Sequence, residues 1–260
     1  LAEILPFLQK FPAASYGVQV EERLTAALAE FEKLESFRTR TQTARTTIEA
    51  TAEYYTQTIR QLLDIASLVS SLADDAEIKS QSIAYMSLLE IKERAGLERA
   101  MGAKGYGAKA FDSLTHTEFV TLIGQQDSYM EVFRAYASPE AVAFYDETVV
   151  GTQVDDVEYW RDIAVEAGYD MLYDEITDIQ WYDGITAKIN LITQVEDYVS
   201  KELLATADGA LSSAWMALLV TLATSIGSLI VAGVACYVVG RSITKPLATL
   251  QDVMGDVADG

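Results

Sequence analysis

Apolar residues recur along most of this chain at intervals of three and four positions, which is the spacing of an amphipathic α-helix. No stretch alternates strictly between apolar and polar residues, and only 4 of the 260 residues are proline. Both observations predict an all-α fold. We expect one helix from about residue 18 into the forties and a second over residues 49–72. Asp74 or Asp75 can cap the start of a third.

Glycine and short polar segments are expected to divide the later helices. Gly102, Gly105 and Gly107 are expected to end the third helix and to form a loop. Thr115 and Glu118 form a capping-box pattern, which predicts the start of the next helix. Further helices are expected to begin after Ser138, Gly151 and Gly168.

The last of these helices carries an apolar seam of coiled-coil spacing. Its members are Ile185, Ile189, Ile192, Val195 and Val199. No proline or glycine interrupts residues 185–207, so we expect a mostly continuous helix between the preceding domain and the segment that follows. A stiff helix can transmit a movement, but a helix that only anchors the domain fits the pattern equally well.

Residues 214–240 form an apolar run of 27 positions without a charge. As an α-helix this run would extend roughly 40 Å, enough to cross a bilayer with some tilt. Trp215 and Tyr237 near its two ends suit the membrane interfaces. A buried core helix seldom lacks a polar face over this length. The sequence therefore predicts a transmembrane helix.

The basic residues beside this run predict its orientation. Arg241 and Lys245 follow it directly, whereas the nearest basic residue before it is Lys201, among acidic residues. The positive-inside rule places residues 241–260 in the cytoplasm and residues 1–213 outside a bacterial inner membrane, in the periplasm or extracellular space. Export needs a signal upstream, so Leu1 is not expected to be the natural start.

Charge and cysteine content exclude several classes of function. The chain has a net charge of −20; residues 241–260 hold two bases and three acids, which leaves 17 bases and 36 acids, a net of −19, in residues 1–213. Such an acidic segment is not expected to bind nucleic acid or anionic lipid. Cys236 is the only cysteine, so neither an intrachain disulfide nor a thiolate metal site can form. No pairing of nucleophile and base, phosphate loop or metal-ligand spacing predicts a catalytic residue, a metal or a cofactor, and the chain is not expected to be an enzyme.

One short basic segment, residues 90–110, contains the candidate binding residues. Arg94 has Glu90 and Glu98 four positions away on either side, the arrangement of a solvated helix face, which favours surface pairing over ligand binding. Arg99 has no acid on its own helix, because its neighbours three and four positions away are Ala95, Gly96, Gly102 and Ala103. A guanidinium in such a groove needs a partner from elsewhere, either a bound anion or a carboxylate of a neighbouring helix.

Three more arginines are candidates to complete an anion site. Arg161 has Glu158 within one helical turn, which favours a structural ion pair. Arg38 and Arg40 precede a threonine-rich segment whose hydroxyl groups could also donate to an anion.

The C-terminal stretch "RSITKPLATLQDVMGDVADG" resembles the first helix of a HAMP module, a linker that relays signals across bacterial membranes. The resemblance rests on Pro246 and Leu247 soon after the apolar run, on Asp259-Gly260, and on an apolar stripe of Leu250, Val253, Met254 and Val257. It implies that Pro246 and Leu247 take part in signal relay, and that the chain forms a homodimer. The alternative is an ordinary helix beside the membrane.

The stretches "YYTQTIRQLL", "AYMSLLEIKERAGLERA" and "LIGQQDSYMEVFRAYASPEAVAFY" resemble the nitrate- and nitrite-sensing (NIT) domain over residues 20–165. The matching elements are the helix of Tyr55, Lys92-Glu93 with Gly96, Glu98-Arg99-Ala100, Gln126 with Phe133, and Ala137-Ser138-Pro139-Glu140. The resemblance implies two stacked four-helix-type bundles outside the cytoplasm that bind a small oxyanion through arginine side chains. Members of that family carry a Glu-Arg-Gly motif early in the first helix. The nearest stretch here, "LQKFPAASYG", lacks this motif, so the motif either lies before Leu1 or is absent.

Together these observations predict three regions: a helical sensor over residues 1–213, a transmembrane helix over residues 214–240, and the start of a HAMP module over residues 241–260. The expected function is a membrane receptor for nitrate or nitrite that signals to a cytoplasmic output such as chemotaxis. The alternatives are a helical domain that binds a protein partner or another small ligand, and the regulatory half of a cyclase or histidine kinase.

Overall fold

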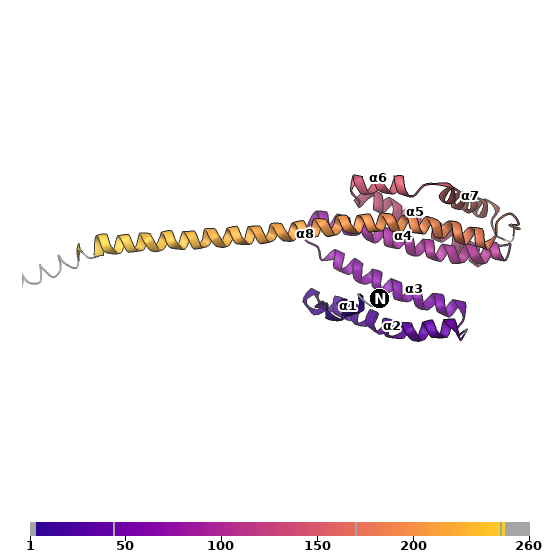
Figure 1. Ribbon diagram of the computed structural model, residues 1–260, viewed down its shortest axis with the longest axis horizontal. Helices are drawn as coiled ribbons and strands as arrows, with labels where there is room; N and C mark the ends of the chain where they lie inside the picture. The colour runs from indigo at the N-terminus through magenta and orange to yellow at the C-terminus, as the bar shows by residue number, and fades with distance from the viewer. Residues whose placement is uncertain (1–3, 44, 170, 245, 248–260) are drawn as a thin grey trace, which may run out of the picture. The chain divides into compact units, whose positions relative to one another are not determined.

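The computed structural model describes residues 4–43, 45–169, 171–244 and 246–247. Throughout this part of the chain the regular elements are helices and no strand occurs, so the predicted all-α class is confirmed (Figure 1). The chain divides into two compact units, residues 1–206 and residues 207–260.

The first helices of the chain pack around a small core of their own. They are α1 (Ile4–Lys10), a 3₁₀ turn (Ala13–Tyr16), α2 (Val18–Gln42) and α3 (Ile48–Ser71). Val20 and Leu24 of α2 are buried against Ile65 and Leu68 of α3. α2 and α3 lie where the apolar spacing predicted them.

A larger bundle follows, built from α4 (Ala76–Gly107), α5 (Ser113–Tyr136), α6 (Pro139–Thr148), α7 (Thr152–Ala167) and the first part of α8 (Asp178–Val239). One core cluster joins α4, α5, α6 and α8, and a second joins α4, α5, α7 and α8. The short helices α6 and α7 therefore follow one another along the same side of the bundle (Figure 1).

Three helix starts of this bundle have side-chain caps. Asp75 accepts from the backbone of α4, and Ser138 caps α6 with Pro139 at the first position, both as predicted. The predicted start of α5 at Thr115 is wrong. Asp112 is the cap instead, and it accepts from both the backbone N–H and the hydroxyl of Thr115, which lower its pKa to about 2.

The predicted loop is wrong for Gly102 and Gly105, which lie within α4, whereas the helix does end at the third predicted glycine, Gly107. A Cβ atom at Gly102 would lie well under 3.0 Å from the ring of Trp181, and one at Gly105 would meet Phe111 as closely. Gly102 and Gly105 therefore allow two large aromatic rings to approach the helix backbone, and these two glycines do not end the helix.

The apolar seam of α8 lies in the core of its own bundle. Ile185, Ile192, Val195 and Val199 are buried in the two core clusters. The coiled-coil spacing is thus explained by packing of α8 against α4, α5, α6 and α7 of the same chain.

In the second unit, α8 continues without interruption to Val239, and one π-helical turn (Gly240–Thr244) follows. The most apolar 18 residues of this helix have a mean hydropathy of 2.1, and none of these residues is buried. By length and composition the helix can cross a membrane. Pro246 and Leu247 are helical and exposed, whereas Leu250, Val253, Met254, Val257 and Asp259-Gly260 lie outside the described residues.

Candidate anion site

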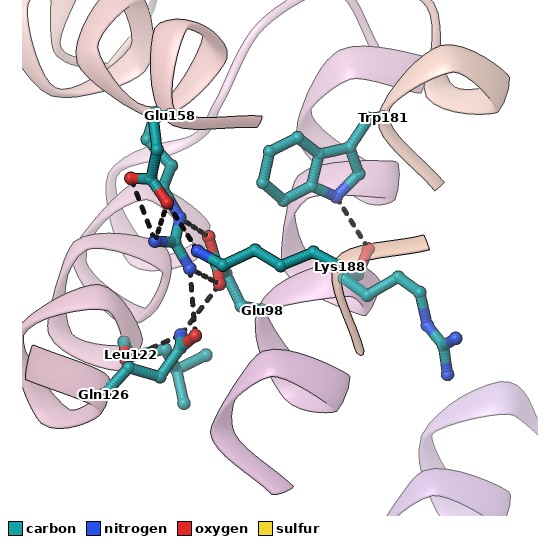
Figure 2. A network of polar contacts seen from close by, with 8 residues as sticks. Glu98, Leu122, Gln126, Glu158, Trp181 and Lys188 are labelled. Atoms are coloured by element: carbon teal, nitrogen blue, oxygen red, sulfur yellow. Dashed lines mark hydrogen bonds and ion pairs between the residues drawn. The ribbon is translucent and has the colours of Figure 1, made fainter. Parts of the chain in front are cut away.

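Arg161 lies at the centre of a buried polar network between α4, α5 and α7. Figure 2 labels its partners Glu98, Gln126 and Glu158. Its Nε and Nη2 atoms donate to the two oxygens of Glu98, at 2.7 and 2.5 Å. Gln126 accepts from Arg161 Nη2 at 2.9 Å and donates to Glu98 at 2.8 Å. Glu98 is 0% exposed, so this is a fully desolvated, two-point ion pair.

A second carboxylate and a lysine complete the network. Glu158 accepts from Arg161 Nη1 at 3.1 and 3.2 Å, and also accepts from Lys188 of α8. Burial opposes the charge of Arg161, but the charge of Glu98 and its hydrogen bonds raise the Arg161 pKa above its usual value. The pKa of Lys188 is lowered by burial and by the neighbouring charge of Arg161.

The four charges of this network balance, and every nitrogen of the Arg161 guanidinium donates to a protein oxygen. A buried cation that is already paired in this way has little to offer an incoming anion. The arrangement favours a structural role for Arg161, joining α4, α5 and α7.

Arg99 directly follows Glu98 on α4, but its surroundings differ from those of Arg161. Its Nη1 atom donates to the hydroxyl of Thr186 at 3.0 Å, and its guanidinium lies 4.8 Å from the ring centroid of Tyr182. Within the described residues, no carboxylate forms an ion pair with it. Arg99 is only partly buried, so donors of its guanidinium remain available to an anion that enters from solvent.

The backbone at Arg99 is held in place by α8. Trp181, which is 0% exposed, packs over Gly102 and donates its indole N–H to the carbonyl oxygen of Arg99 at 3.1 Å (Figure 2). Trp181, Tyr182 and Thr186 all belong to α8, so the position of Arg99 depends on that helix.

Arg94 is partly neutralised on the surface of α4. Its Nη1 atom pairs with Glu90 at 2.5 Å, and its Nε atom donates to Gln125 at 3.3 Å. The pair with Glu90 was predicted, whereas Glu98 turns inward to Arg161. Arg94 and Arg60 line a pocket of about 390 Å³. The same two arginines also line a smaller pocket, where the carboxylates of Asp64, Glu90 and Glu93 would compete with an anion for them.

The remaining candidate, Arg38, is exposed on α2, where its ion-pair partner is Glu35 at 4.0 Å. Arg40 lies 4.8 Å from the ring centroid of Phe37 on the same helix. Within the part of the chain that the structure describes, no hydrogen bond or ion pair joins Arg38 to Arg94, Arg99 or Arg161.

Glu98, Gln126 and Lys188 were not identified as a network from the sequence. A signal for Glu98 was present, because it shares one helical stripe with Ile91, Ala95, Gly102 and Gly105, all of which are buried. An acid in a stripe of small and apolar residues indicates a buried carboxylate that needs a cation. That cation is Arg161, which lies 63 residues further along the chain on another helix. Helical spacing cannot predict such a tertiary contact.

Comparison with known proteins supports a sensing role. The nitrate regulatory protein of Klebsiella oxytoca is 26% identical over 189 residues, which cover 73% of this chain and 47% of that protein. The structure of the NasR transcription antiterminator matches with a TM-score of 0.70 at 24% identity, covering 78% of this chain and 54% of that one, and this similarity concerns the fold. The chain thus spans about half the length of these relatives. The family described as nitrate and nitrite sensing matches residues 3–204, which is most of the chain, so the chain belongs to the nitrate and nitrite sensing family.

Proposed function

We propose that this chain is the sensor and membrane portion of a receptor that binds nitrate or nitrite outside the cytoplasm and relays the signal along α8. The observation that carries the proposal is Arg99. It is a partly buried arginine with no acidic partner among the described residues, and it contacts the helix that continues to Val239.

The chemistry of Arg99 suits a planar oxyanion. A guanidinium presents a flat fork of N–H donors that can engage two oxygens of nitrate at once. The ring of Tyr182 supports one face of the fork, and the hydroxyl of Thr186 can act as an acceptor for Arg99 or turn to donate to the ligand. Arg94 is a weaker candidate because Glu90 competes for it, and Arg161 and Arg38 already have acidic partners.

The relay follows from the position of the contacts. A ligand can shift an equilibrium between two arrangements only by its difference in affinity for them. A nitrate that bonds to Arg99 of α4 and to the hydroxyl of Thr186 of α8 would replace their direct hydrogen bond, and so would change the contacts between α4 and α8. The same α8 continues into the apolar segment, so a shift of that helix would reach the far end of the segment.

Three further features belong to the proposal. Residues 214–240 cross the inner membrane with residues 1–213 in the periplasm, Pro246 and Leu247 begin a HAMP relay, and the receptor is a homodimer. The length and hydropathy of α8 support the first, and the resemblance of residues 241–260 supports the other two. A regulatory output, as the nitrate regulatory protein and the transcription antiterminator suggest, would follow in the whole protein.

Nitrate should bind the full chain, and Arg99→Gln should weaken that binding by about tenfold or more, because charge-assisted hydrogen bonds are lost. Isothermal titration calorimetry of the purified full chain with sodium nitrate, against sodium chloride, measures this. Arg134→Gln removes an exposed arginine that pairs with Asp146, and is expected to bind nitrate as the unaltered chain does. Unchanged nitrate affinity in Arg99→Gln would remove Arg99 from the site.

The membrane location can be tested with the only cysteine. Cys236 is exposed on the apolar part of α8, so in water it would react readily with a maleimide. In the full chain reconstituted into lipid vesicles, we expect a membrane-impermeant maleimide to leave Cys236 unlabelled. Dissolving the vesicles in a denaturing detergent should restore labelling. Rapid labelling in intact vesicles would contradict a transmembrane position.

A further inference from the structure

A further pocket, of about 500 Å³, lies among α1, α2, α3, α4 and α8, and neither Arg99 nor its contacts Tyr182 and Thr186 line it. No residue that lines it carries a charge, although the chain contains 58 charged residues. All of its lining residues are apolar except Ser70, Ser82 and Tyr85. Its size falls within the range of small-molecule sites, which are mostly apolar with a few polar groups that fix orientation.

The polar groups of this pocket differ in what they can offer a ligand. The hydroxyl of Ser70 donates to the carbonyl of Ala66 at 2.7 Å, and that of Tyr85 donates to Glu196 at 3.5 Å. Ser82 is only 7% exposed, and within the described part of the chain its hydroxyl forms no hydrogen bond with protein, although its oxygen is not among the fully buried atoms that lack a partner. The Ser82 hydroxyl thus faces the pocket with its hydrogen-bonding capacity available, so a ligand atom can bond to it in place of water.

We propose that this pocket binds an uncharged, mainly apolar small molecule that carries one hydrogen-bonding group, such as a hydroxyl or carbonyl, placed against Ser82. The lack of lining charges disfavours an anion, because a desolvated carboxylate would meet no cation there. The site is therefore distinct in chemistry from the proposed nitrate site and does not depend on it.

A molecule bound in this pocket would contact α8, the helix that also contributes Tyr182 and Thr186 to the proposed nitrate site. Leu203 of α8 forms part of the lining, together with Phe7 of α1, Phe11 just after α1, Ile65 of α3 and Met86 of α4. A molecule in the pocket would thus bridge the N-terminal helices to α4 and α8. The pocket would give the protein a second chemical input on α8.

Binding can be measured with a matched pair of probes, 1-hexanol and hexanoate, which share their apolar chain and differ in charge. The full chain in lipid nanodiscs, labelled with ¹³C at the methionine methyl groups, reports the site through Met86, which lines the pocket. Met216, in the apolar segment, reports partition of hexanol into the bilayer. We expect a saturable shift of the Met86 signal with hexanol and none with hexanoate.

Two substitutions separate the pocket from general effects on the fold. Ser82→Ala should weaken hexanol binding about threefold to tenfold through loss of one hydrogen bond, while the pocket stays open. Ala66→Leu should fill the pocket and abolish the Met86 shift, whereas Ala52→Leu, exposed on the same helix, should leave it unchanged. The proposal is overturned if Met86 responds no more than Met216, if hexanoate binds equally well, or if both Ser82→Ala and Ala66→Leu bind hexanol normally.

Discussion

Replacing Glu98 with Gln is expected to lower the free energy of unfolding by about 3–5 kcal/mol. Arg161 would lose its two-point ionic partner while it stays 5% exposed, and Gln126 would lose one of its two acceptors, keeping the carbonyl oxygen of Leu122. A cation left buried without this partner is strongly destabilising. Urea unfolding of the full chain, followed by tryptophan fluorescence, gives the value.

The matched control is Asp146→Asn. Asp146 also pairs with an arginine at 2.5 Å, but Arg134 and Asp146 are 43% and 52% exposed. Water and side-chain entropy reduce such pairs to less than about 1 kcal/mol. The double variant Glu98→Gln with Arg161→Gln should lose less stability than the two single changes together, since no charge is then left unpaired. Equal effects of Glu98→Gln and Asp146→Asn would contradict the buried network.

Gly102→Ala is expected to destabilise the bundle by about 1–3 kcal/mol, although alanine favours a helix more than glycine does. The new methyl group would overlap the ring of Trp181, which is fully buried and held by its bond to Arg99. Either the ring or α4 must move. Thermal or urea unfolding measures the loss, and nitrate affinity should fall as well because Arg99 is displaced.

Gly96→Ala on the same helix separates packing from helix propensity. A Cβ atom at Gly96 meets nothing within 4 Å, so this change should stabilise α4 by up to about 1 kcal/mol. The two substitutions are chemically identical and six residues apart on one helix. Stabilisation by Gly102→Ala of the same size would show that Trp181 does not pack on the helix as described.

The elements of the fold that could be predicted are those with local signals. The spacing of apolar residues identified α2 and α3, and Asp75 and Ser138 each cap the helix that begins directly after them. The role of the glycines in α4 was predicted wrongly because glycine serves two different structural purposes that the sequence alone does not distinguish. It permits positive φ, as at Gly151 and Gly168, and it permits close approach, as at Gly102. Only the tertiary partner distinguishes the two.

In the candidate site, too, local features could be predicted from the sequence and contacts between distant segments could not. Helical spacing predicted that Arg99 has no acidic partner on its own helix, and none is found there. Its contacts with Tyr182 and Thr186 join segments more than 80 residues apart, and nothing in the local pattern could select them. Glu158 was correctly expected near Arg161, three positions away on α7, whereas Glu98 and Lys188 approach it from other helices.

The most direct test of nitrate binding at Arg99 is to follow the indole ¹⁵N–H NMR signal of Trp181 during a nitrate titration. This N–H donates a hydrogen bond to the carbonyl oxygen of Arg99. In the full chain labelled at tryptophan, nitrate should move this signal saturably in the unaltered protein and should not move it in Arg99→Gln. The signal of Trp215, in the apolar segment, gives a comparison for general salt effects. A Trp181 signal that stays in place at saturating nitrate, or that moves equally in Arg99→Gln, would contradict binding at this arginine.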